Sequence, residues 1–147
     1  MNKRILGFLI LSSFFSVWMF SCSKSEGETN ISSSSSNRSH YKGENCMNCH
    51  YTEGPGEGWF SAAGSVYGDF LNHRARIFDA NTGALLKTVQ IDLQGNLYTT
   101  EEIDMTNGIT IDIIDEQDNI VSVMQTVVFN AQCNLCHDDK YQGKIFL

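Results

Sequence analysis

Between residue 59 and about residue 130, short runs of β-branched, aliphatic and aromatic residues alternate with turn-forming residues. The runs recur at a spacing of about ten residues, as in all-β domains. No stretch of this region has a convincing helical period. The pattern therefore predicts a mainly β fold, a small antiparallel sandwich of six or seven strands. The six candidate strands are residues 60–67, 74–79, 85–91, 96–100, 109–114 and 120–128.

Strict alternation of apolar and polar residues is clearest in the last two candidate strands. Ile109, Ile111 and Ile113 alternate with polar Thr110 and Asp112. Val121 and Val123 alternate in the same way. Because successive side chains of a strand point to opposite faces, we expect both sets to face the core. Asn107-Gly108, just before the first set, is a strong hairpin signal.

Residues 60–128 resemble the carboxypeptidase-regulatory-like, or transthyretin-like, domain. The resemblance is carried by Gly64-Ser65-Val66-Tyr67, by the Asp79-to-Gly83 turn with its Thr82-Gly83 pair, and by Asp92 followed by Gly95-Asn96-Leu97-Tyr98. It implies an immunoglobulin- or transthyretin-like sandwich. It implies little about function, because such a domain is a scaffold for many activities.

The N-terminus has the features of an export signal. Lys3 and Arg4 precede an apolar stretch, residues 5–20, which is of secretory length and short for a membrane span. The stretch ends in Met19-Phe20-Ser21-Cys22, which resembles the lipobox of bacterial lipoproteins. This predicts a signal peptide over residues 1–21 and a lipid on Cys22. An ordinary signal peptide or an uncleaved anchor is the alternative.

Residues 22–39 are rich in serine and contain almost nothing to bury, so we expect a flexible tether between lipid and domain. Loss of residues 1–21 would leave eight basic and 17 acidic residues, a net charge of about −9. Such a charge disfavours nucleic acid as a partner and would suit a basic protein.

Two copies of Cys-x-x-Cys-His flank the predicted sandwich, in residues 40–58 and 131–147. They are Cys46-Met47-Asn48-Cys49-His50 and Cys133-Asn134-Leu135-Cys136-His137. This pentapeptide is the attachment signal for c-type haem, in which the cysteines bind the haem covalently and the histidine ligates iron. Only four of the 147 residues are histidine. Composition alone would therefore place histidine after both pairs with a probability of about 0.1%.

The flanks resemble exported bacterial multihaem c-type cytochromes. His40, six residues before Cys46, and Gly43 fit a His-x-x-Gly-x-x-Cys lead-in, and Cys-Asn-x-Cys-His resembles a terminal haem motif. The resemblance implies two haem c groups, with His50 and His137 as proximal ligands. Candidates for the distal ligands are His40, His73 and Met124. Met124 could instead pack in the core.

Two other readings of the cysteines remain open. The two pairs could bind zinc, although 83 residues separate them, against about 15–20 in zinc ribbons. They could also form two disulfides that staple a structural or adhesive surface module. Export explains the odd count of five cysteines, because lipidation of Cys22 leaves two pairs.

The sequence has no phosphate-binding loop, nucleophile elbow or zinc-protease histidine pair, so we do not expect an enzyme. The expected function is electron transfer by a dihaem lipoprotein at the bacterial cell envelope or surface. Its partners would be other redox proteins or copies of itself, with a membrane reached through the lipid on Cys22. The absence of Asp after Cys22 favours the outer membrane.

Overall fold

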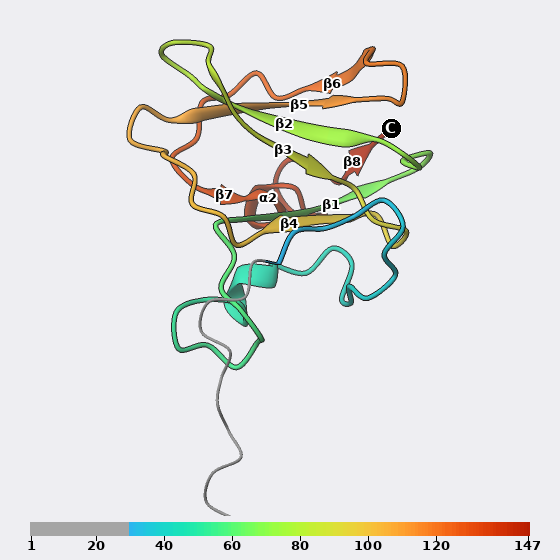
Figure 1. Ribbon diagram of the computed structural model, residues 1–147, viewed down its shortest axis with the longest axis vertical. Helices are drawn as coiled ribbons and strands as arrows, with labels where there is room; N and C mark the ends of the chain where they lie inside the picture. Colours follow the sequence, from blue (N-terminus) through green and yellow to red (C-terminus); the bar gives the residue numbers. More distant parts are fainter. Residues whose placement is uncertain (1–29) are drawn as a thin grey trace, which may run out of the picture.

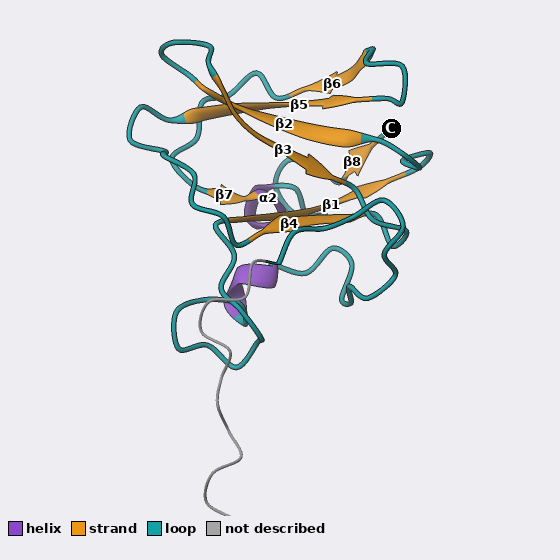
Figure 2. Ribbon diagram, in the orientation of Figure 1, coloured by secondary structure: helices purple, strands orange, loops and turns teal. Residues whose placement is uncertain are grey.

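The computed structural model describes residues 30–147, which form a two-layered β-sandwich (Figures 1 and 2). One sheet contains β4 (Asn96–Thr99), β1 (Ala62–Tyr67), β7 (Ala131–Gln132) and β8 (Ile145–Phe146). The other has the order β3 (Leu85–Gln90), β2 (Arg74–Asp79), β5 (Ile109–Ile114) and β6 (Ile120–Val123). Pairing is antiparallel except where β7 and β8 run parallel to β1. The predicted mainly β sandwich is confirmed, with eight strands in the described residues.

Five of the six predicted strands agree with β1 to β5 within two residues, and β2 and β5 agree at both ends. The sixth prediction was too long, because the chain leaves β5 after Met124 and pairs with it again at Val128. Val121 and Val123 are 44% and 58% exposed, so the prediction that they face the core was wrong. β6 is an edge strand, and on this side the two sheets do not close over each other.

The core lies between the sheets and is made mainly of alanine, valine and isoleucine side chains. Ile109 and Ile113 are buried and Ile111 packs partly buried against them, as their alternation predicted. The opposite sheet contributes Val66 and Leu97. Burial of these apolar side chains is the main stabilising term of such a domain.

The strand neighbouring β1 is interrupted by a helical turn. β7 pairs with Ala62 and Ala63, and β8 pairs with Val66 and Tyr67. Between them the chain forms α2 (Cys133–Cys136), which contacts β1 at the level of Gly64 and Ser65. The second Cys-x-x-Cys-His motif therefore replaces the middle of an edge strand.

Residues 30–36 close the opposite side of the sandwich. Ile31 bridges to Thr99 of β4, and Ser32, only 2% exposed, donates its hydroxyl to the carbonyl of Gln90 in β3. Ser39 then accepts a hydrogen bond from buried Asn96. The second half of the predicted tether therefore lies against the sandwich instead of standing free of it, because its serines satisfy polar groups at the strand ends.

The predicted signal peptide and the lipidated Cys22 lie outside the described residues. No helix within residues 30–147 is long and apolar enough to cross a membrane.

Candidate functional site

The first Cys-x-x-Cys-His motif begins with a single 3-10 turn, η2 (Cys46–Asn48). Asn45 caps this turn by accepting a hydrogen bond from the backbone N–H of Met47 at 3.2 Å. The glycine-rich loop that follows folds back onto the motif, because the N–H of Gly56 donates to the carbonyl of Cys49 at 2.9 Å. The loop therefore encloses His50, which is only 9% exposed.

The imidazole of His50 is fixed from two directions. Its Nδ1 lies 3.0 Å from the carbonyl oxygen of Glu57 and 3.3 Å from that of Gly58. Since a carbonyl can only accept, the neutral ring carries its proton on Nδ1, which leaves the lone pair on Nε2. One ring face stacks on Phe60 at a centroid distance of 4.2 Å. A Cβ on Gly56 would lie 2.6 Å from Nδ1, so this close enclosure requires glycine.

The second motif forms α2 and the residues after it. His137 Nδ1 lies 3.2 Å from the carbonyl oxygen of Gly143 and therefore also carries the proton, which leaves Nε2 as the available nitrogen. Gly64 of β1 allows the close approach of α2, because a Cβ there would lie 2.6 Å from the Cβ of Cys133. The two motifs thus share one feature: an imidazole whose Nδ1 is held by a backbone carbonyl.

Asn134 joins the two motifs through β1. Its side chain, 6% exposed, accepts from the N–H of Ser65 at 2.9 Å and donates to the carbonyl of Glu44 at 2.7 Å. A second link runs from Asn45 Nδ2 to Gln132 Oε1 at 3.0 Å. The residues that immediately precede both motifs are therefore in direct contact, although the motifs are far apart in sequence.

Burial raises the pKa of the Cys133 thiol to about 11, and the neighbouring Cys46 and Cys136 add smaller contributions in the same direction. Burial also raises the pKa of Cys46. Both thiols are therefore protonated at neutral pH. All four described cysteines are free. Within residues 30–147, no group of three or more His, Cys, Asp or Glu side chains is placed so that it could hold a metal ion.

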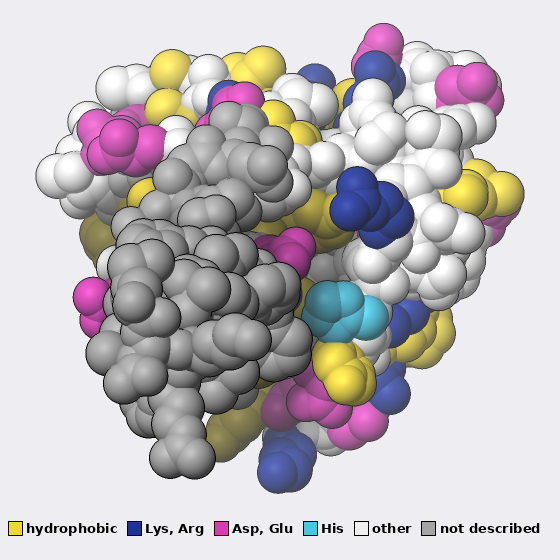
Figure 3. All heavy atoms as spheres, turned by 60° about the horizontal axis from the view of Figure 1, so that its bottom comes forward, with side chains coloured by type: hydrophobic (Ala, Val, Ile, Leu, Met, Phe, Trp, Pro, Cys, Tyr) yellow, Lys and Arg dark blue, Asp and Glu magenta, His cyan; other side chains and the backbone are white. Residues whose placement is uncertain are grey.

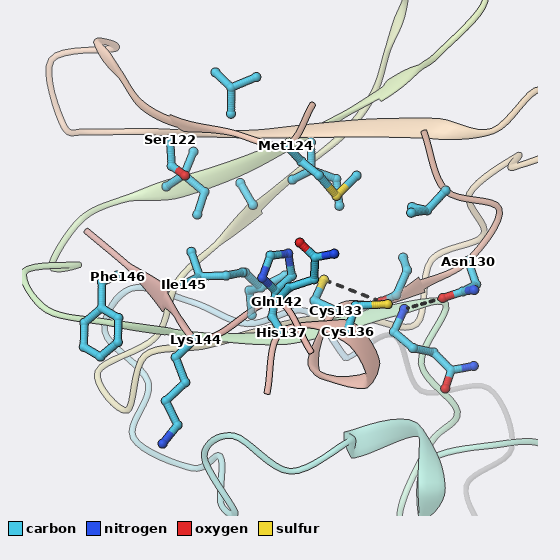
Figure 4. Close-up of a pocket in the computed structure, with 18 residues that line it drawn as sticks. Ser122, Met124, Asn130, Cys133, Cys136, His137, Gln142, Lys144, Ile145 and Phe146 are labelled. Atoms are coloured by element: carbon cyan, nitrogen blue, oxygen red, sulfur yellow. Dashed lines mark hydrogen bonds between the residues drawn. The ribbon is translucent and has the colours of Figure 1, made fainter. Parts of the chain in front are cut away.

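A cavity of about 330 Å³ lies on the open side of the sandwich, beside α2. One wall carries Cys133, Cys136 and His137, and the other carries residues of β5 and β6 with Met124 (Figure 4). Most of its lining residues are apolar. Phe146 and Val123 also line it, although they are 69% and 58% exposed. An apolar cavity rimmed by exposed apolar side chains indicates a binding site for an apolar group.

The candidate distal ligands have three different placements. His40 is exposed and lies beside the first motif, with its ring centroid 5.9 Å from that of His50. Met124 lines the cavity of the second motif. His73 lies in the loop between β1 and β2, where its Nδ1 contacts the carbonyl of Leu71 at 2.9 Å, and it does not line the cavity. The structure therefore brings His40 and Met124 to a motif, but not His73.

The face that carries the first motif shows acidic and basic side chains intermixed, with a histidine at the surface (Figure 3). Tyr41, Tyr51 and Trp59 are exposed to 76%, 52% and 46% in the segments next to His50. This surface therefore offers apolar area beside the first motif.

Sequence reasoning found both motifs but missed the residues that position them, namely Gly56, Gly64, Ser65 and Asn134. The glycines are spaced like ordinary loop and strand residues, and only the fold places them against His50 and Cys133. No family model, curated protein or solved structure matches this chain.

Proposed function

We propose that the protein is an electron carrier with two covalently attached haem c groups, one at each Cys-x-x-Cys-His motif. The observation that carries the proposal is the hydrogen bond that the Nδ1 atoms of His50 and His137 each make to a backbone carbonyl. Each holds Nδ1–H against a backbone carbonyl and leaves Nε2 for iron. Such a second contact is what orients a metal-binding histidine and fixes its tautomer.

The surroundings of both motifs fit haem. Cys133 and Cys136 lie at the wall of an apolar cavity, which would cover part of a large apolar macrocycle and keep water from it. At the first motif, the glycine-rich loop packs closely against His50 at Gly56. Aromatic side chains next to this loop stay exposed and could cover a haem face. The four cysteines are free thiols, as thioether attachment requires.

When bound, each haem would supply one-electron redox chemistry at its iron. The protein's own contribution is to hold the two imidazoles, to restrict water at the second site and to keep the motifs together through Asn134 and Asn45. An exported lipoprotein that carries such groups would transfer electrons at the cell envelope, to other redox proteins or to copies of itself.

The test is expression of the full chain, with its signal, in a host that matures c-type cytochromes. We expect a denatured mass that includes two haems and a reduced-minus-oxidised spectrum with a c-type α band. The double variants C46S/C49S and C133S/C136S should each lose the mass of one haem. A colourless wild-type protein, beside a control cytochrome that matures normally, would refute the proposal and favour a disulfide-stapled surface module.

A further inference from the structure

The second motif faces a donor atom across its cavity. Cys133, Cys136 and His137 form one wall, and Met124 lies on the opposite wall, just after β6 (Figure 4). A six-coordinate haem would take one axial ligand from each side of its ring, and donor atoms on two facing walls fit that requirement. Resting on the proposed function, we infer that Met124 is the distal axial ligand of the haem attached at Cys133 and Cys136.

Other polar side chains of the cavity are poorer ligands. Lys144 is held in an ion pair, with its Nζ 2.9 Å from Asp139 Oδ2, and an ammonium group has no lone pair to donate. Gln132 and Gln142 carry amides, which are hard donors. The thioether of Met124 is neutral and soft, and methionine with histidine is an established axial pair for haem. Among the described residues that line the cavity, Met124 is the one methionine.

The backbone holds Met124 at this wall without making it part of the close-packed core. Its N–H donates to the carbonyl of Ile111 in β5 at 2.8 Å, and the chain is fixed to β5 again by the two hydrogen bonds between Val128 and Ile109. Residues 125–127 form a loop between these anchor points. A flexible, unbranched side chain at a fixed backbone position can adjust to the iron.

Ligation by Met124 would also make the two haems unequal. Methionine raises the reduction potential of a haem relative to a second histidine. The haem at His137 would then accept electrons more readily than a haem whose two axial ligands are both histidines. With His40 as the second ligand of the first haem, electrons would reside mainly on the second haem.

The experiment compares full-length wild type with M124L, M124H and M105L, each matured in the same host and labelled with [methyl-¹³C]methionine. Leucine has nearly the volume of methionine, so M124L should fold. Met105 packs half-buried against the core and does not line the cavity, which makes M105L the matched control. The measurements are denatured mass, the methyl spectrum of the ferrous protein and the potential of each haem.

We expect one methionine methyl resonance of the wild type to be shifted far upfield by the haem ring current. It should disappear in M124L and persist in M105L, and M124H should lower the potential of one haem. The inference is overturned if the shifted resonance persists in M124L, or is absent from a wild type whose mass includes two haems. A wild type without haem mass would instead overturn the proposed function, and this inference with it.

Discussion

Asn134 offers the sharpest test of how the two motifs are held together. Its buried side chain makes hydrogen bonds to the N–H of Ser65 at 2.9 Å, to the Ser65 hydroxyl at 3.0 Å and to the carbonyl of Glu44 at 2.7 Å. Replacement by alanine removes all three. At about 1 kcal/mol net for each bond, N134A should lower the free energy of unfolding by about 3 kcal/mol.

That loss is a large fraction of the roughly 5–15 kcal/mol that stabilises a typical domain. At about 4 °C per kcal/mol for a domain of this size, the melting temperature should fall by about 12 °C. The assay is urea and thermal unfolding followed by far-ultraviolet circular dichroism, on the haem-free and the haem-loaded protein.

The matched control is N48A, which truncates an asparagine inside the other motif. Asn48 is exposed, and its side chain contacts only Asn45 at 3.2 Å among the interactions within residues 30–147, so the change should stay within about 0.5 kcal/mol. Equal unfolding midpoints for N134A and N48A would refute the reasoning that Asn134 ties the second motif to β1 and to the chain before the first motif.

Further expectations concern the residues that sequence reasoning missed. G56A should displace His50 and G64A should displace Cys133, each at a cost of about 1–3 kcal/mol in unfolding experiments. Under the proposed function, the masses of proteolytic peptides should show haem loss at the first motif in G56A and at the second motif in G64A. Unchanged haem loading in both variants would contradict this. S32A should destabilise the domain by about 1–2 kcal/mol, because the Ser32 hydroxyl bonds both Gln90 and Tyr98, whereas S35A at an exposed position should not. Hydrogen bonds from Asn107 and then Thr82 lower the pKa of Asp79 in the folded protein below its value in the unfolded chain. The unfolded state therefore binds more protons as the pH falls. The resulting stabilisation is present above about pH 4 and is lost at lower pH. Urea midpoints measured from pH 2 to 5 should show a smaller pH dependence for D79N than for wild type.

Periodicity located most strands but not their sheet partners. The turns at residues 81–83 and 118–119 each join two strands of one sheet, as a hairpin does. Asn107-Gly108, a stronger hairpin signal, instead ends a connection from β4 in one sheet to β5 in the other. The backbone conformation of Gly108, with φ of 75°, was predictable, because glycine adopts positive φ without a steric cost. The partner of β5 was not, because it depends on which faces pack together.

The missed strands have a similar explanation. β7 and β8 contain two residues each, too few for any alternation to be recognised. Their pairing with β1 comes from tertiary contacts, since α2 and the link through Asn134 hold this stretch against it. The Cys-x-x-Cys-His pattern itself could be recognised because haem attachment would fix its residue types and spacing. The residues that position each motif could not be recognised, because they depend on contacts between distant segments.

The sandwich also explains how two motifs separated by 83 residues become neighbours. The first motif and its loop run almost directly into β1, and β7 runs directly into the second motif. Because β7 pairs with Ala62 and Ala63, the second motif begins beside the middle of β1. The chain before the first motif folds back to the same place, where Gly43 donates to the Ser65 hydroxyl, and Asn45 therefore meets Gln132. Under the proposed function, proximity of the two redox centres is therefore a consequence of strand pairing. Any variant that breaks the pairing of β7 with β1 should separate the centres and slow electron exchange between them.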